Sequence, residues 1–167
     1  MNSDIQRIIN EVRSSAEEII SESPDQIRAV YIMDREGTVI TYVTNTILIN
    51  AGNTFFAAPP RFISSLKGGL VSTLPIGDVN YILMQGVDGI IQLMNIRDAG
   101  YIMVIINSEA SIGLIRIILE KYTDRLYDLL RKLLSVSEEE VIEVINVEIT
   151  PKDIEDVINF IKSKAVM

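Results

Sequence analysis

In the centre of the chain, the hydrophobic residues gather in three short runs, Tyr81–Gln85, Ile90–Ile96 and Tyr101–Ile106. The polar breaks between them, Gly86–Gly89 and Arg97–Gly100, are each four residues long and end in glycine. Such breaks are typical of hairpin loops, because glycine readily adopts the positive φ that a tight turn needs. Parallel strands would instead need a crossover of about a dozen residues or more. The pattern therefore predicts an antiparallel meander of three strands.

The same signature occurs earlier in the chain. Two β-rich runs, Ile27–Met33 and Thr38–Val43, flank the polar turn Asp34–Gly37, which again ends in glycine. The arrangement predicts a β-hairpin.

Helical periodicity surrounds these strands. Residues 2–22 repeat apolar positions at steps of three and four, and Pro24 ends that pattern. After Ile106 a second helix is expected, capped by Ser108 or Ser111 and ending near Leu134. Its predicted apolar stripe consists of Ile112, Ile115, Leu119, Leu126 and Leu130.

The segment between the hairpin and the meander is predicted to form two short helices at an angle. Residues 46–58 can be helical, but Pro59-Pro60 must break or kink the element before Arg61–Leu66. Adjacent residues of one helix do not share a face, so Phe55 and Phe56 cannot both point into one core. One of them is either covered by a partner subunit or is a partly buried loop aromatic.

The final residues are interpreted as an addition to the domain. Ser137–Glu140 has the pattern of a capping box and predicts a short helix to about Ile145. Thr150-Pro151 predicts the start of a further helix, with Thr150 as its cap and Pro151 at its first position. We therefore expect a domain over residues 1–134 and a helical extension over 135–167, packed on that domain or on a partner subunit.

Charge and composition argue against several classes of function. The net charge of −8 argues against nucleic acid and anionic membranes as partners, since both select basic surfaces. No run of about 18 apolar residues is present, so no transmembrane segment is expected. The amino-terminal residues lack the continuous apolar core of a signal peptide. A cytoplasmic protein is expected.

Candidate chemistry is sparse. The chain has no cysteine and no histidine, so thiol catalysis is excluded and acid–base relays and transition-metal sites lose their commonest member. Asp78, Asp88 and Asp98 stand in three separate loops without metal-ligand spacing. Arg35 and Arg97, at hairpin tips, are possible partner contacts that could act as arginine fingers, or ordinary solvated turn residues. We expect no catalytic residue, no cofactor and no metal site.

The expected order is helix, two strands, helix, three strands, helix, with further C-terminal helices. This predicts an α+β fold with a five-stranded antiparallel sheet and helices on both faces. With its segments Ala29–Ile40, Gly86–Gly89 and Asn107–Arg116, the chain resembles the roadblock/dynein-light-chain family over about residues 2–134. The resemblance implies a roadblock/longin-like fold and a homodimer in which the middle helix and the strand Val79–Gln85 meet their twofold mates.

Members of that family serve as platforms for small Ras-like GTPases and are not enzymes in their own right. The resemblance therefore implies a non-enzymatic homodimeric module that binds or regulates a small Ras-like GTPase, or scaffolds a larger regulatory assembly. The expected interface residues are Ile47, Ala51, Phe55, Phe56, Phe62, Tyr81 and Leu83. The alternative is a small-molecule sensor of similar architecture. A sensor needs polar residues aimed into one pocket, and Asn80, Gln85, Gln92 and Asn95 alternate poorly toward a shared cavity.

Overall fold

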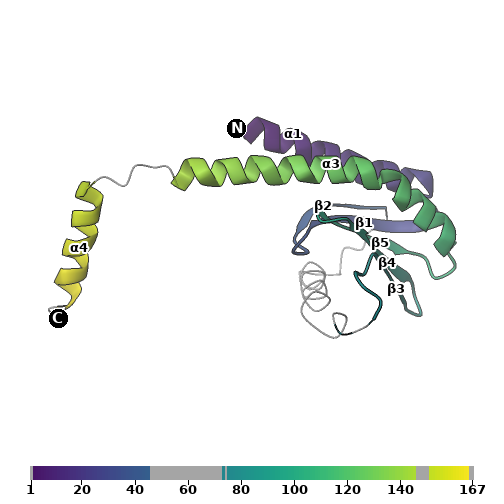
Figure 1. The fold of residues 1–167 in the computed structure, drawn as a ribbon. Helices are drawn as coiled ribbons and strands as arrows, with labels where there is room; N and C mark the ends of the chain where they lie inside the picture. Colours follow the sequence, from purple (N-terminus) through teal and green to yellow (C-terminus); the bar gives the residue numbers. More distant parts are fainter. Residues whose placement is uncertain (1, 46–72, 74, 146–150, 166–167) are drawn as a thin grey trace. The chain divides into compact units, whose positions relative to one another are not determined.

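A computed structural model describes residues 2–45, 73, 75–145 and 151–165 of the chain. The chain divides into two compact units, Met1–Leu133 and Leu134–Met167. The first unit contains a sheet and the helices on it (Figure 1).

The sheet has five strands in the order β2-β1-β5-β4-β3, and every neighbouring pair is antiparallel. The strands are β1 (Ile27–Asp34), β2 (Val39–Thr44), β3 (Tyr81–Gln85), β4 (Ile90–Ile96) and β5 (Gly100–Ile106). The predicted fold class is confirmed, and the predicted strands agree with these bounds to within about one residue. The strand expected from Val79 begins two residues later, at Tyr81.

Local hydrogen bonds explain the hairpin between β1 and β2. Asp34 Oδ1 accepts from the backbone N–H groups of Glu36 and Thr38, both at 2.9 Å. Gly37 has a φ of 83°, a conformation that glycine adopts without the steric cost of a side chain. The carboxylate and the glycine together close the turn that the sequence predicts.

Helix α1 (Asn2–Glu22) and helix α3 (Ile112–Ile145), the latter over its residues in the first unit, lie side by side over one face of the sheet (Figure 1). Ser111 Oγ accepts from Leu114 N at 3.4 Å, so Ser111 is the cap of α3. Burying each large aliphatic side chain contributes about 1.5–3 kcal/mol. The fully buried residues of α3 include Ile115, Leu119, Leu126 and Leu130, and those of α1 include Val12, Ala16 and Ile19.

A carboxylate links the two helices. Glu22 Oε1 accepts from Lys121 Nζ at 2.7 Å and from Tyr122 Oη at 2.6 Å. The hydrogen bond from Lys121, followed by that from Tyr122, lowers the pKa of Glu22. Burial and the bond to Glu22 raise the pKa of Tyr122 to about 12. One turn earlier on α1, both Glu18 oxygens lie 3.0 Å from Arg125 Nη1.

The opposite face of the sheet carries a second apolar cluster. Tyr31 stacks on Tyr42 there, with ring centroids 5.7 Å apart. The buried members of the cluster are Ala29, Tyr31, Met33, Leu93 and Met103. The helices predicted over residues 46–66, including the break at Pro59-Pro60, lie outside the described residues.

Helix α3 is longer than predicted. It runs without interruption to Ile145, so the predicted end near Leu134 and the separate short helix from Ser137 are wrong. Residues 135–145 contain no proline or glycine, and serine or valine inside a helix costs only about half a kcal/mol relative to alanine. Because no proline or glycine precedes the capping pattern at Ser137, the helix continues through it.

The second unit contains α4 (Pro151–Ala165), which begins at the predicted proline. Of the helices that the structure describes, none has the length and apolar content needed to cross a membrane.

Candidate interaction surface

Strand β3 forms one edge of the sheet, and its only strand neighbour among the described residues is β4. Two hydrogen bonds fix the direction of its backbone. Gly86 N donates to Gly89 O at 2.8 Å, and Asn95 N donates to Asn80 O at 2.9 Å. Hydrogen-bonded and non-hydrogen-bonded pairs alternate along antiparallel strands, so the even-numbered residues of β3 bond to β4.

The odd-numbered residues therefore direct their N–H and C=O groups away from β4. These residues are Tyr81, Leu83 and Gln85, and we call their outward backbone groups the β3 edge. An edge of this kind is a ready template for pairing with another strand. Two of the three residues, Tyr81 and Leu83, belong to the predicted interface. Gln85 lies within the strand that was predicted to meet its mate, but it was not singled out, because its contribution comes from the backbone and depends on the hairpin register.

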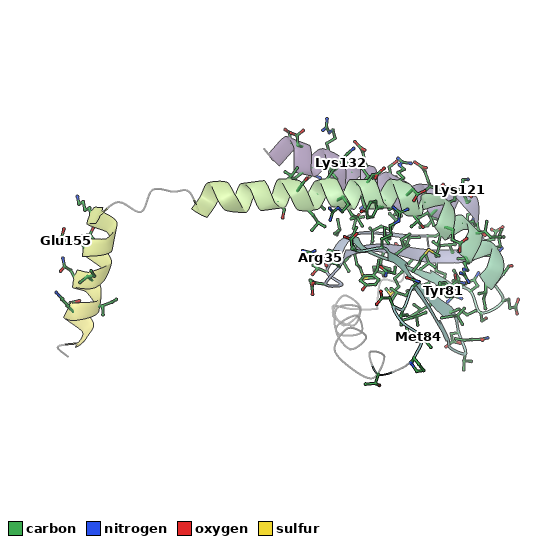
Figure 2. All side chains as sticks on the ribbon, viewed as in Figure 1. Arg35, Tyr81, Met84, Lys121, Lys132 and Glu155 are labelled. Carbon is green, nitrogen blue, oxygen red and sulfur yellow. The ribbon has the colours of Figure 1, made fainter. Side chains whose placement is uncertain are left out.

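The side chains of β3 differ in exposure along the strand. Tyr81 lies on the helix side, with the guanidinium of Arg116 5.1 Å from its ring centroid. Burial raises the pKa of Tyr81, and the charge of Arg116 acts in the opposite direction. The Tyr81 hydroxyl is buried without a hydrogen-bond partner among the residues described. Figure 2 shows Tyr81 and Met84 on this strand.

Apolar exposure rises toward the turn after β3. Met84 is 39% exposed, and Val87 in the following turn is 93% exposed. Met84 belongs to the strand predicted to meet its mate but was not singled out, and Val87 was not predicted, because exposure cannot be read from residue type alone. The end of the β3 hairpin thus combines outward backbone groups with exposed apolar side chains, which are the two ingredients of strand-to-strand recognition.

The two candidate arginines lie at turns, as predicted. Arg35 is in the turn between β1 and β2 (Figure 2). Arg97, in the turn between β4 and β5, has a φ of 49°, forms an ion pair with Asp124 and lies 4.5 Å from the ring centroid of Tyr127. Arg97 therefore contacts two residues of α3, while its side chain remains 55% exposed.

The strand amides do not converge on one pocket. Gln92 Nε2 donates to Ile112 O at 3.3 Å, which places Gln92 on the helix side. Asn95, three residues later in the same strand, points to the opposite face because side chains alternate along a strand. The geometry therefore gives no support to the sensor alternative.

The remaining predicted interface residues lie outside the described residues. They are Ile47, Ala51, Phe55, Phe56 and Phe62. Within the residues that the structure describes, acidic side chains form no group of three or more that could hold a metal ion.

Comparison with solved structures assigns this arrangement to the roadblock/LC7 fold, as the sequence resemblance predicted. A structure described as MglB with tetrameric arrangement matches with a TM-score of 0.63 and 12% identity over 75% of this chain and 92% of that chain. Myxococcus xanthus MglB matches with a TM-score of 0.62 and 15% identity over 75% of this chain and 91% of that chain. A roadblock/LC7 domain from Streptomyces avermitilis matches with a TM-score of 0.53 and 9% identity over 70% of this chain and 95% of that chain. At these identities the likeness is one of fold.

Comparison of the sequence itself finds no matching family model and no matching curated protein.

Proposed function

We propose that the chain is a non-enzymatic homodimeric module that binds or regulates a small Ras-like GTPase, or scaffolds a regulatory assembly that contains one. The observation that carries the proposal is the β3 edge on a roadblock/LC7 fold. The proposed place of action is the cytoplasm, where such GTPases are found.

The β3 edge suits self-pairing about a twofold axis. If the axis passes beside Leu83, Tyr81 lies opposite Gln85 of the partner subunit, and every outward group of one strand faces an outward group of its mate. A twofold interface of this kind is self-complementary. Pairing would join two five-stranded sheets into one. The predicted residues Ile47, Ala51, Phe55, Phe56 and Phe62 are proposed to lie at the same interface.

A proline at Gln85 tests the pairing. Proline lacks the N–H group and is tolerated at a sheet edge where that group would point away from the ladder. Gln85→Pro should therefore keep the β3–β4 hairpin but remove one intersubunit hydrogen bond per copy. At about 1 kcal/mol for each bond, the dissociation constant of the dimer should rise on the order of tenfold or more.

Light scattering across a dilution series measures this change, and Gln85→Ala, which keeps the N–H group, is the matched control. The alanine variant should retain the mass of the parent dimer at dilutions where the proline variant dissociates. An unchanged dissociation constant in Gln85→Pro would show that the β3 edge does not pair.

The GTPase proposal needs a separate measurement. The parent protein is titrated into purified small Ras-like GTPases loaded with GDP or with a non-hydrolysable GTP analogue. We expect one nucleotide state to bind more tightly, and we expect the chain alone to hydrolyse no GTP. Failure of the intact dimer to bind any GTPase of the panel in either state would overturn this part of the proposal.

A further inference from the structure

Helix α4 has exposed isoleucines on one side. Ile158 is 45% exposed and Ile161 is 60% exposed. Residues three positions apart are neighbours on a helix surface, so the two side chains form part of one stripe. α4 has 15 residues, and an isolated helix of about this length is marginal in water. An apolar surface that covers the stripe would stabilise the helix.

The charges beside this stripe restrict what can cover it. Glu155, Ile158 and Lys162 follow one another at steps of three and four residues, so the acid and the base lie along the same side of the stripe. Both charged side chains are exposed. The stripe is therefore bordered by a negative charge toward its amino-terminal end and a positive charge toward its carboxyl-terminal end.

This polarity fits an antiparallel copy of the same helix. We consider two antiparallel α4 helices related by a twofold axis that passes between Ile158 and Asn159. Glu155 of each helix then lies opposite Lys162 of the other, so the contact occurs twice. The two Ile158 side chains then lie next to each other at the axis. In a parallel pair the twofold axis would run along the helices, so Glu155 and Lys162 of the two copies would lie on opposite flanks of the contact and could not pair.

We propose that α4 pairs in antiparallel orientation with α4 of a second copy of this chain. The inference rests on the proposed self-association and adds to it a second contact, formed by the C-terminal unit. Both contacts have twofold symmetry.

Engineered cysteines test the pairing in the full chain, which has no cysteine of its own. In the antiparallel pair, two copies of residue 158 are one helical rise apart along the axis, about 1.5 Å, whereas two copies of residue 161 are about 7.5 Å apart. Ile158→Cys should therefore form an intersubunit disulfide several-fold faster than Ile161→Cys under mild oxidation. Lys152→Cys, near the start of α4, should cross-link least.

Charge variants give an independent readout. Glu155→Lys and Lys162→Glu, each made alone in the Ile158→Cys background, place like charges opposite each other and should slow cross-linking. The double exchange restores opposite charges and should recover the parent rate. Equal rates for Ile158→Cys and Ile161→Cys, or no recovery in the double variant, would overturn the antiparallel pair.

The outcome is separable from that of the sheet-edge dimer. Light scattering that shows a dimer sensitive to Gln85→Pro, together with no disulfide at residue 158, would reject the α4 pair and leave the proposed function standing. The α4 stripe would then be covered within its own chain or by another protein. Cross-linking at residue 158 that persists in Gln85→Pro, with no sensitivity of mass to that variant, would reject the β3 pairing alone.

Discussion

Gly100 lies where β1 and α3 both come close to the backbone of β5. It begins β5 and pairs with Asp34 of β1 and with Ile96 of β4. A Cβ atom at this position would overlap the carbonyl oxygen of Met33 and would lie 2.9 Å from Leu130 Cδ1 of α3. The missing side chain is therefore what allows α3 to cross the strand at this point.

Gly100→Ala is expected to destabilise the protein by about 1–3 kcal/mol, because a rigid backbone oxygen cannot move aside as a flexible side chain could. Gly113→Ala is the matched control, since a Cβ there meets nothing within 4 Å. It should leave stability unchanged or raise it by up to about 1 kcal/mol, because alanine favours the helical backbone. Urea denaturation measures both. Equal effects of the two substitutions would contradict the packing argument.

For single residues, the sequence predicted the place in a turn or strand better than it predicted the distant residues that each side chain contacts. Arg97 was correctly placed at a turn, but its contact with Asp124 joins residues 27 positions apart, and no local pattern indicates it. The same holds for Gly100: the turn signature explains a glycine there, whereas the close approach of Met33 and Leu130 depends on how strands and helix pack.

Among the elements, α1 and α3 are joined by Glu22, whose carboxylate bonds to Lys121 and Tyr122 and remains in contact with water. Its side chain is 28% exposed, against 64% for Lys121. Glu22→Gln removes the charge that Lys121 and Tyr122 both contact. We expect a loss of about 1–2 kcal/mol in the free energy of unfolding at neutral pH, measured by urea denaturation.

The same substitution makes a pH prediction. Because the folded-state pKa of Glu22 is lowered from its ordinary value of 4.5, the unfolded chain binds this proton more readily, and acid favours unfolding. The stability difference between parent and Glu22→Gln should be full above that ordinary value and shrink as the pH falls below it. A difference that stays constant through this range would show that the charge is not its source.

Glu17→Gln serves as the control for this experiment. Glu17 pairs with Arg13 on the same helix at 3.3 Å, and both side chains are about half exposed. Exposed pairs of this kind contribute at most about 0.5 kcal/mol, so this variant should stay close to the parent.

The elements themselves were largely predictable because their signals are local. Asp34 and Gly37 mark one hairpin and Gly86–Gly89 marks another, and each turn closes within four residues. The end of α3 was not predictable in this way. The capping pattern at Ser137 lies within an uninterrupted run of helix-compatible residues, so both a new helix and a continued helix fit the sequence. Which of the two forms depends on tertiary contacts that a local pattern does not contain.

For the whole molecule, the middle segment provides the remaining test of self-association. Phe55 and Phe56 are neighbours in the sequence, and both belong to the predicted interface, with a partly buried loop aromatic as the alternative for one of them. Phe55→Glu or Phe56→Glu should then lower the solution mass from about twice the 18.7 kDa chain toward a single chain on dilution. A glutamate buried without a partner is strongly unfavourable. A parent protein that is monomeric at every concentration would reject the dimer outright.

The strand order was predictable only in part. The meander and the first hairpin follow from adjacent segments, but the central pairing of β1 with β5 joins residues such as Val30 and Val104, which are far apart in the sequence. That the hairpin and the meander form one sheet was inferred from the order of the elements and from the family resemblance, and no local pattern indicates it. The β3 edge likewise became visible only when the register of its hairpin was known.

The brevity of β3 limits what can bind there. Five residues leave three with outward backbone groups, too few for main-chain hydrogen bonds alone to hold a foreign peptide against the loss of its freedom, since each contributes only about 1 kcal/mol. An unrelated extended segment would therefore bind only weakly and dissociate rapidly. Discrimination between partners must therefore come from the side chains that border the strand, so a short sheet edge can bind selectively in a crowded cell.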